Sequence, residues 1–252
     1  MPELDGKRAL VTGAAQGLGL AIAKLFVTRG AQVMIADIDE AGAKTAAEEL
    51  GDAARAVRGD VTQAHELDAA VEACVNAFGG LDIMVNNAGI EIVKPLFEHT
   101  EEEFDRIYAV NVKGVWLGMK AAFPVLPKPG GVIVNMASLA GLGGVPLFGA
   151  YSASKAGVVQ ITRAAAIELR PTGIRINAVC PAFVNTAMVD RLKPIVEGAV
   201  GVPFDDLAAL KQGRLGTPEE VAEMVAFLAS DDSSFSTGGT FVLDGGLQAG
   251  LL

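Results

Sequence analysis

The sequence predicts a doubly wound α/β fold, in which helices cover both faces of a parallel sheet of about seven strands. Short aliphatic runs of strand length alternate along most of the chain with amphipathic stretches of helix length. Repeated strand–helix–strand units of this kind are typical of parallel sheets that are buried on both faces. In addition, a glycine-rich turn joins the first run to the first helical stretch. Together they predict a parallel sheet that helices cover on both faces.

The predicted strands are apolar runs bounded by turn residues. They lie at 7–12, 31–36, 54–58, 81–85, 132–136, 174–179 and 240–243. The first predicted helix, 17–29, carries Leu18, Ile22, Leu25 and Phe26 on one stripe, and Gly30 ends it. The same periodicity predicts helices at 39–50, 66–78 and 153–169.

Two further helix starts are indicated by capping residues. Thr100 is expected to cap a helix that reaches about residue 126, with Glu103 completing a capping box. Thr217 is followed by Pro218, which favours the first position of a helix. The segment 183–212 fits no single helix because Pro194 and scattered glycines interrupt it. We expect an irregular substrate lid there, and the alternative is a surface excursion without a role in binding.

Length, charge and hydropathy argue against several classes of protein. At 252 residues the chain, 1–252, is expected to form a single domain, because α/β folds of that length commonly do. The net charge is −10 and no cluster of Lys or Arg occurs, which argues against nucleic-acid binding. The apolar runs are too short for a membrane span, and the first residues do not form a secretory signal.

The cysteines and histidines do not indicate a metal site. Cys74 and Cys180 lie far apart in the sequence, so no disulfide framework or metal-ligand spacing is present. They are expected to be buried thiols in the cytoplasm. His65 and His99 have no neighbouring Cys or carboxylate cluster, and both are expected at the surface near helix starts.

The turn after the first strand contains Gly13, Gly17 and Gly19 in the spacing G-x-x-x-G-x-G. Glycines let the backbone approach a pyrophosphate, which the N–H groups of a following helix then stabilise. Asp37 ends the second strand, where a carboxylate can accept hydrogen bonds from adenosine ribose hydroxyls. The alternative is that Asp37 caps the next helix, a role for which Asp39 competes. Residues 14–16 and 38 include no Arg or Lys, so NAD is favoured over NADP.

Tyr151 and Lys155 form the strongest candidate for catalysis. Residues four apart share one helix face, so the ammonium group can lie near the phenol. A free phenol has a pKa of about 10, and a neighbouring cation lowers that value towards the neutral range. The alternative is a core tyrosine beside a solvated lysine.

Taken together, these features resemble the short-chain dehydrogenase/reductase family over nearly the whole chain. The motifs are Thr12-Gly13-x-x-x-Gly17-x-Gly19, Asp60-Val61, Asn86-Asn87-Ala88-Gly89, Asn111, Ser138 and Tyr151-x-x-x-Lys155. The resemblance implies a Rossmann-type fold and an NAD-dependent enzyme that acts on CH–OH groups. It also implies that the enzyme interconverts a secondary alcohol and a ketone by hydride transfer.

The resemblance assigns four catalytic residues. Tyr151 would exchange a proton with the substrate oxygen, and Lys155 would lower the pKa of Tyr151 and hold the nicotinamide ribose. Ser138 would hydrogen-bond the substrate oxygen, while Asn111 would position a water that connects Lys155 to solvent. No metal is implied.

The residues that the resemblance assigns to cofactor binding follow the motifs. They are Gly13, Gln16, Gly17, Leu18, Gly19, Asp37, Asp60, Val61, Asn87, Ala88, Gly89, Tyr151, Lys155, Pro181, Val184 and Thr186. Asp60 and Val61 would lie along the adenine, and Thr186 would contact the nicotinamide carboxamide. One departure is Pro181-Ala182, where such proteins usually have Pro-Gly. The extra methyl group of Ala182 is expected to alter that turn or the substrate floor.

Two further expectations concern the substrate and the assembly. Apolar residues in the candidate lid, including Phe183, Met188 and Leu192, favour a hydrophobic small molecule such as a hydroxysteroid or cyclic alcohol. The alternatives are a 3-oxoacyl-carrier-protein reductase and, from another class, a catalytically silent NAD sensor. The helix around Trp116 and the helix 151–169 are apolar on more than one side, and the tail 243–252 is largely apolar. They predict a homotetramer.

Overall fold

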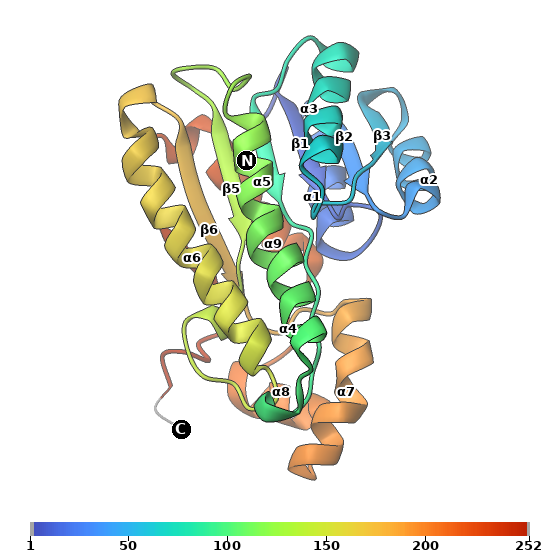
Figure 1. Ribbon diagram of the computed structural model, residues 1–252, viewed down its shortest axis with the longest axis vertical. Coiled ribbons are helices and arrows are strands. Elements are labelled where there is room, and N and C mark those ends of the chain that lie inside the picture. Colours follow the sequence, from blue (N-terminus) through green and yellow to red (C-terminus); the bar gives the residue numbers. More distant parts are fainter. Residues whose placement is uncertain (1–2, 251–252) are drawn as a thin grey trace.

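All seven predicted strands pair in one parallel sheet in the computed structural model, which describes residues 3–250. Their order is β3-β2-β1-β4-β5-β6-β7, and Figure 1 shows helices on both sides of it. The strands are β1 (Arg8–Thr12), β2 (Gln32–Asp37), β3 (Ala54–Arg58), β4 (Ile83–Asn86), β5 (Val132–Met136), β6 (Arg175–Pro181) and β7 (Thr240–Leu243). This confirms the predicted doubly wound, Rossmann-type fold.

The strand order reverses at β1, and this reversal places the site. From β1 the chain adds β2 and β3 on one side, and it then returns to add β4 on the other side. Val11 pairs with Ile35 of β2 and with Val85 of β4, so the carboxyl ends of these strands lie together. Ligands of open α/β sheets bind outside the carboxyl ends of the strands at such a switch point.

Two apolar cores lie on opposite faces of the sheet, because successive side chains of a strand point to opposite sides. In β1, Ala9 and Val11 pack into one core, whereas Leu10 packs into the other. The first core joins the sheet to α1 (Gly17–Thr28), α2 (Glu40–Leu50) and α9 (Pro218–Ala229). The second joins it to α3 (Ala64–Phe78), α5 (Gly114–Ala122) and α6 (Gly149–Leu169).

Both predicted capping boxes are present. The Thr100 side chain accepts from the backbone N–H of Glu103 at the start of α4 (Glu101–Tyr108), and Thr217 does the same at α9. The helix expected from 100 to about 126 differs in one respect. It is not one continuous α-helix, because a π-helical segment, Ala109–Lys113, separates α4 from α5.

The expectation of an irregular segment at 183–212 is wrong. Two helices, α7 (Ala187–Val200) and α8 (Phe204–Gln212), lie beyond the carboxyl ends of the strands, at the bottom of Figure 1. Pro194 lies inside α7. The helix forms because Val189, Leu192 and Val196 recur at helical spacing and are buried against Phe204 of α8.

A second difference concerns His99, which was expected at the surface. Its side chain is only 3% exposed. His99 precedes the N-cap Thr100, and a residue at that position commonly turns inward against the first helical turn. Both cysteines are buried free thiols, as expected.

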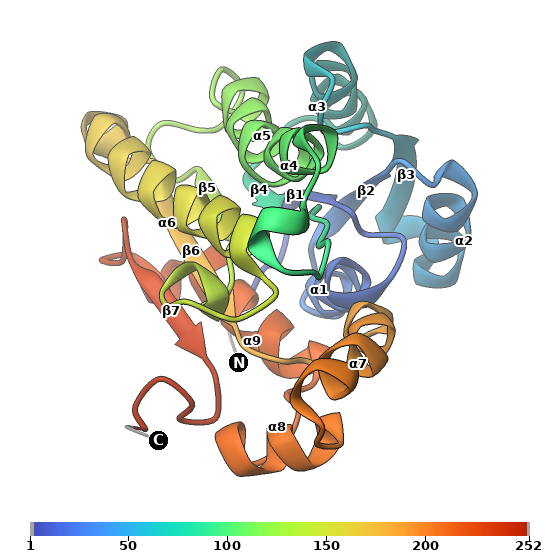
Figure 2. The same cartoon turned by 60° about the horizontal axis from the view of Figure 1, so that its bottom comes forward.

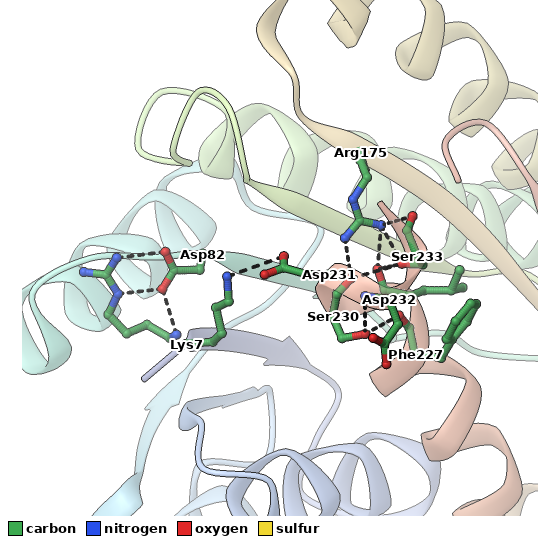
Figure 3. Close-up of polar contacts among 10 residues, drawn as sticks. Lys7, Asp82, Arg175, Phe227, Ser230, Asp231, Asp232 and Ser233 are labelled. Carbon is green, nitrogen blue, oxygen red and sulfur yellow. Dashed lines mark hydrogen bonds and ion pairs between the residues drawn. The ribbon is translucent and has the colours of Figure 1, made fainter. Parts of the chain in front are cut away.

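Arginine side chains hold the amino ends of two strands, β6 and β1, and Figure 3 shows the contacts of the one at β6, Arg175. Arg175, the first residue of β6, donates to the Leu228 and Ser230 carbonyls at 2.9 and 2.8 Å and to Ser233 Oγ at 2.7 Å. Its guanidinium therefore satisfies the carbonyls at the end of α9. At β1, Arg8 pairs with Asp82 at 2.7 Å, just before β4. Neither arginine lies at the carboxyl ends of the strands, which form the opposite edge of the sheet.

Candidate active site

A cleft of about 810 Å³ lies at the carboxyl ends of the strands, where the strand order reverses. Most of the predicted site residues line it: Gly13, Gln16, Gly17, Leu18, Asp37, Asp60, Val61, Asn87, Ala88, Gly89, Tyr151, Lys155 and Thr186. Figure 2 shows α7 beside the turn between β1 and α1. The same α7 contributes Ala187, Met188 and Arg191 to the wall of the cleft.

The glycine turn is held against the end of β4 by hydrogen bonds. Thr12 Oγ1 accepts from the backbone N–H groups of Asn87 and Ala88 at 3.0 and 3.1 Å. In return, Asn87 Nδ2 donates to the Thr12 and Gly13 carbonyls at 2.9 Å each. A Cβ at Gly13, where φ is +63°, would lie 2.7 Å from the Cα of Ala88. A Cβ at Gly19 would lie 2.6 Å from Asn87 Nδ2, so both positions require glycine.

Asp37 lies at one end of this cleft and is bound to the glycine turn. Its Oδ2 accepts from the Ala15 N–H and its Oδ1 from the Asp39 N–H, each at 3.0 Å. The start of α2 is capped by Asp39, which accepts from the Gly42 N–H at 3.0 Å. The capping role considered for Asp37 therefore belongs to Asp39. Asp37 is left facing the cleft beside Ile38.

Asp60 and Val61 form the wall next to Asp37. Asp60 Oδ1 accepts from both the N–H and the hydroxyl of Thr62, at 2.9 and 2.8 Å. These bonds fix the turn after β3. Val61 is 9% exposed and packs against Gly114, the first residue of α5, where a Cβ would lie 2.9 Å from Val61 Cγ2.

Tyr151 and Lys155 both lie on α6, which begins at Gly149, earlier than the predicted 153. Lys155 is 4% exposed, and its Nζ donates to the Met136 carbonyl at 2.8 Å and lies 5.7 Å from the centre of the Tyr151 ring. Ser138 follows β5, and its hydroxyl donates to the Pro181 carbonyl at 3.5 Å. These side chains meet where β5 and β6 end.

Burial dominates the electrostatics of this pair. It raises the pKa of Tyr151 to about 12, while a hydrogen bond with Ser138 lowers that value and the charge of Glu91 raises it further. Burial also lowers the pKa of Lys155 to about 8. The prediction that Lys155 holds the pKa of Tyr151 below its ordinary value is therefore wrong for the chain alone. Burial of the phenol is the largest influence on the pKa of Tyr151, and the charge of Lys155 is not among the influences that lower it.

Asn111 lies behind the cleft wall rather than on it. It is fully buried in the π-helical segment. Its Oδ1 accepts from the Ile90 N–H at 2.9 Å, and its Nδ2 donates to the Ile90 carbonyl at 2.9 Å and to Ser154 Oγ at 3.0 Å. Asn111 therefore fixes the loop after β4 against α6.

Several predicted residues lie outside the cleft wall: Gly19, Asn111, Ser138, Pro181 and Val184. The Ala182 N–H donates to the Leu243 carbonyl of β7 at 2.9 Å, so this turn continues the sheet. Val184 forms an isolated parallel bridge with Gly216. Thr186 caps α7 by accepting from the Val189 N–H at 3.4 Å.

Sequence reasoning missed a buried carboxylate, Glu91. Its side chain is 10% exposed and forms a 3.8 Å ion pair with Arg191 of α7. Burial raises its pKa, which the charges of Arg191 and Lys155 oppose. Glu91 belongs to no motif, so no local signal indicated it. Glu91 itself is not among the residues that line the cleft, whereas Met188, expected in the candidate lid, is. The wall residues that sequence reasoning missed flank motifs: Ile38, Gly59, Thr62, Gln63, Ile90, Arg106, Ala109, Val110, Lys113, Met136, Ala137, Ala187 and Arg191.

Among residues 3–250, no group of three or more His, Cys, Asp or Glu side chains is placed to hold a metal ion. In that part of the chain, no helix combines the length and apolar character that crossing a bilayer requires.

Known proteins are similar over almost the whole chain. The family model described as enoyl-(acyl carrier protein) reductase matches residues 13–248. A 3-alpha-(or 20-beta)-hydroxysteroid dehydrogenase of Mycobacterium tuberculosis is 43% identical over 98% of this chain and 92% of its own. A galactitol 2-dehydrogenase of Agrobacterium fabrum is 42% identical, covering 96% and 98%. The crystal structure of a 3-ketoacyl-(acyl-carrier-protein) reductase from Brucella melitensis, complexed with NADH, superposes with a TM-score of 0.88. It is 40% identical, over 97% of this chain and 99% of that one.

Proposed function

Because the chain belongs to the short-chain dehydrogenase/reductase family, we propose that it is an NAD-dependent oxidoreductase that interconverts a secondary alcohol and a ketone. One observation carries this proposal. The buried Lys155 and the Tyr151 phenol lie one helical turn apart and line the same cleft as the glycine turn and Asp37. The proposed proton-transfer group, Tyr151, and the glycine turn expected to bind the dinucleotide therefore line the same cleft.

The residues of the cleft fit NAD. The close approach of Gly13 and Gly19 to their neighbours leaves backbone, rather than side chains, at the start of α1, where N–H groups suit a pyrophosphate. Asp37 faces the cleft with a carboxylate that suits ribose hydroxyls and repels a 2′-phosphate. When bound, NAD supplies the acceptor for the hydride that leaves the carbinol carbon.

The proposed roles of the chain's own residues follow from their contacts. Tyr151 takes the hydroxyl proton of the alcohol, and Ser138 hydrogen-bonds the same oxygen, because both hydroxyls lie at the ends of β5 and β6. Lys155 stabilises the phenolate and holds the nicotinamide ribose. Asn111 maintains the loop after β4 and the water that connects Lys155 to solvent.

We propose a hydrophobic substrate that α7 and α8 cover as a lid. The apolar cluster between these helices and the start of α6 includes Phe148, Leu192 and Phe204, with Tyr151 and Phe183 packed against it. The similarity to a hydroxysteroid dehydrogenase supports this class. The similarity to a 3-ketoacyl-(acyl-carrier-protein) reductase supports the alternative of a carrier-linked substrate. Against that alternative, a chain with a net charge of −10 has no long-range attraction to an acidic carrier.

The test is a screen of alcohols and β-hydroxyacyl thioesters with NAD, followed by NADH absorbance. The proposal expects a higher kcat/KM for apolar secondary alcohols. A higher value for the thioester would favour the carrier-linked alternative. NADH binding without turnover of any alcohol would favour the silent sensor.

We also propose a cytoplasmic homotetramer. Trp116 on α5 and Ile167 on α6 are 45% and 65% exposed, and Phe123 follows α5 with 37% exposed. Apolar helix faces of this kind suit subunit contacts. The apolar tail 243–252 is part of the same prediction, and its last two residues, 251 and 252, lie outside the described residues. Sedimentation at micromolar concentration tests the assembly, and a species of 25.9 kDa would contradict it.

A further inference from the structure

The cleft wall is positively charged, although the chain as a whole has a net charge of −10. Four cations and two carboxylates line it: Arg106, Lys113, Lys155, Arg191, Asp37 and Asp60. This difference matters for a dinucleotide. NAD and NADH carry a diphosphate, so they are anions that a negatively charged protein surface repels at long range.

Arg106 and Lys113 differ from the other two cations of the wall, because no neighbouring group of the described chain offsets their charge. Both residues are exposed, and neither forms an ion pair or a side-chain hydrogen bond with any residue from 3 to 250. By contrast, Arg191 is paired with Glu91, and Lys155 is buried. The charges of Arg106 and Lys113 are therefore available to a ligand.

The two carboxylates of the wall already accept hydrogen bonds from the protein. Asp37 accepts from the N–H groups of Ala15 and Asp39 at 3.0 Å each. Asp60 accepts from the N–H and the hydroxyl of Thr62 at 2.9 and 2.8 Å. These donors offset part of each negative charge. The carboxylates therefore do not cancel the attraction that the exposed cations exert on an anion.

Arg106 and Lys113 lie on the adenine side of the proposed cofactor site. Arg106 is in the last turn of α4, and Lys113 ends the π-helical segment that follows. Lys113 directly precedes Gly114, where an added Cβ would lie 2.9 Å from Val61 Cγ2. Since Val61 is expected to lie along the adenine, the two cations flank the part of the cleft that receives the nucleotide.

We propose that Arg106 and Lys113 form a positive rim that attracts phosphorylated nucleotides and speeds the entry of the dinucleotide into the cleft. Cations that line a cleft raise the local concentration of an anionic ligand and its rate of association, and salt screens this effect. The nicotinamide ring is neutral in NADH and positive in NAD, so the rim attracts NADH more strongly. The choice of NADH as the ligand rests on the proposed function.

Stopped-flow measurement of NADH association tests the rim. Arg106→Gln combined with Lys113→Gln should lower kon about fivefold at an ionic strength of about 0.02 M, and less than about twofold at about 0.5 M. The rate of dissociation should change less than kon, because steering acts on the approach of the ligand. Arg106→Lys combined with Lys113→Arg keeps both charges and should leave kon within about twofold of the wild type.

Arg170→Gln combined with Lys211→Gln is the matched control. Both residues are exposed and lie outside the cleft wall, and neither forms an ion pair or a side-chain hydrogen bond with any residue from 3 to 250. This variant loses the same two positive charges and should leave kon within about twofold of the wild type. An equal fall of kon in both double variants would show that the net charge of the chain sets the rate, which would overturn the inference.

Nucleotides of different charge separate attraction from a change in the shape of the site. In titration calorimetry at low salt, loss of the rim should weaken the binding of ADP about fivefold. The binding of adenosine, which has no phosphate, should stay within about twofold. An equal loss for both ligands would mean that the substitutions disturb the adenine site, and this would overturn the inference. Far-UV circular dichroism and sedimentation show that each variant is folded and has the same assembly.

These measurements also separate failure of the inference from failure of the proposed function. NADH binding with an unchanged kon in the rim variant would overturn the inference and leave the proposed function intact. A lower kon for NADH and weaker ADP binding, without turnover of any alcohol by the wild type, would support the inference and contradict the proposed function. If neither NADH nor ADP binds to the wild type, both fail.

Discussion

Replacing Lys155 by methionine should make the protein more stable at neutral pH while abolishing its activity. Burial lowers the pKa of Lys155 from its ordinary 10.5 to about 8, which corresponds to about 3 kcal/mol against the charged form. Methionine has a similar length and no charge to desolvate. The substitution also removes the 2.8 Å hydrogen bond to the Met136 carbonyl, a loss of about 1 kcal/mol. The expected net gain in the free energy of unfolding is about 2 kcal/mol at pH 7.

The pH dependence of this gain follows from linkage. Below pH 8 the lysine is charged in both states, so the wild type carries the full penalty of burial. Between pH 8 and 10.5 the native lysine loses its proton before the unfolded one does, and the stability of the wild type rises relative to the variant. At pH 10 less than about 1 kcal/mol of the penalty is left, which the lost hydrogen bond offsets.

Urea unfolding of the cofactor-free protein at pH 7 and pH 10 measures both quantities. Thermal unfolding at pH 7 is a second measurement. Its midpoint should be about 4 °C higher in Lys155→Met than in the wild type, for a chain of this length. Lys211→Met, at an exposed lysine of α8, is the control and should change stability by less than about 0.5 kcal/mol. A Lys155→Met variant that is less stable than the wild type at pH 7, or equally stabilised at both pH values, would show that burial of the charged lysine does not destabilise the folded protein.

Three other substitutions test separate parts of the site. Asp37→Ala removes the ribose acceptor, so NAD affinity in a fluorescence titration should fall by about 10- to 150-fold and discrimination against NADP should relax; a wild type that prefers NADP would contradict this. Gly19→Ala places a Cβ against the turn and should weaken NADH binding at least tenfold, whereas Gly198→Ala, where no atom lies within 4 Å of the added Cβ, should leave it unchanged. Glu91→Gln removes a charge that raises the pKa of Tyr151, so the rise of alcohol oxidation with pH should move to lower pH; an unchanged profile would show that the two groups do not interact.

The fold could be predicted from the sequence because its signals are local. Each strand is a continuous apolar run, and the capping boxes at Thr100 and Thr217 lie within four residues. The segment 183–212 was harder to predict because Pro194 suggested a break. Burial of Leu192 and Val196 against α8 outweighs that local preference, and such burial is a tertiary property.

The motifs indicated which residues line the proposed cofactor site, but not the pKa values of its titratable groups. Gly13, Asp37 and Tyr151 lie on one cleft, as their order in the chain suggested. The raised pKa of Tyr151 follows from desolvation, which no spacing of residues encodes. Glu91 lies next to Ile90, which lines the cleft, and Asn111, twenty residues further along the chain, holds both backbone groups of Ile90.

In the proposed function, the Tyr151 hydroxyl carries the proton between alcohol and protein. Tyr151→Phe keeps the ring and its packing against Phe148, 6.2 Å between ring centres, and removes only the hydroxyl. The most direct measurement is steady-state alcohol oxidation by this variant, combined with NADH fluorescence titration of the same sample. We predict that turnover falls by about 100-fold or more while NADH affinity stays within a few-fold of the wild type. Turnover near the wild-type rate in a variant that binds NADH would mean that a group other than Tyr151 carries the proton.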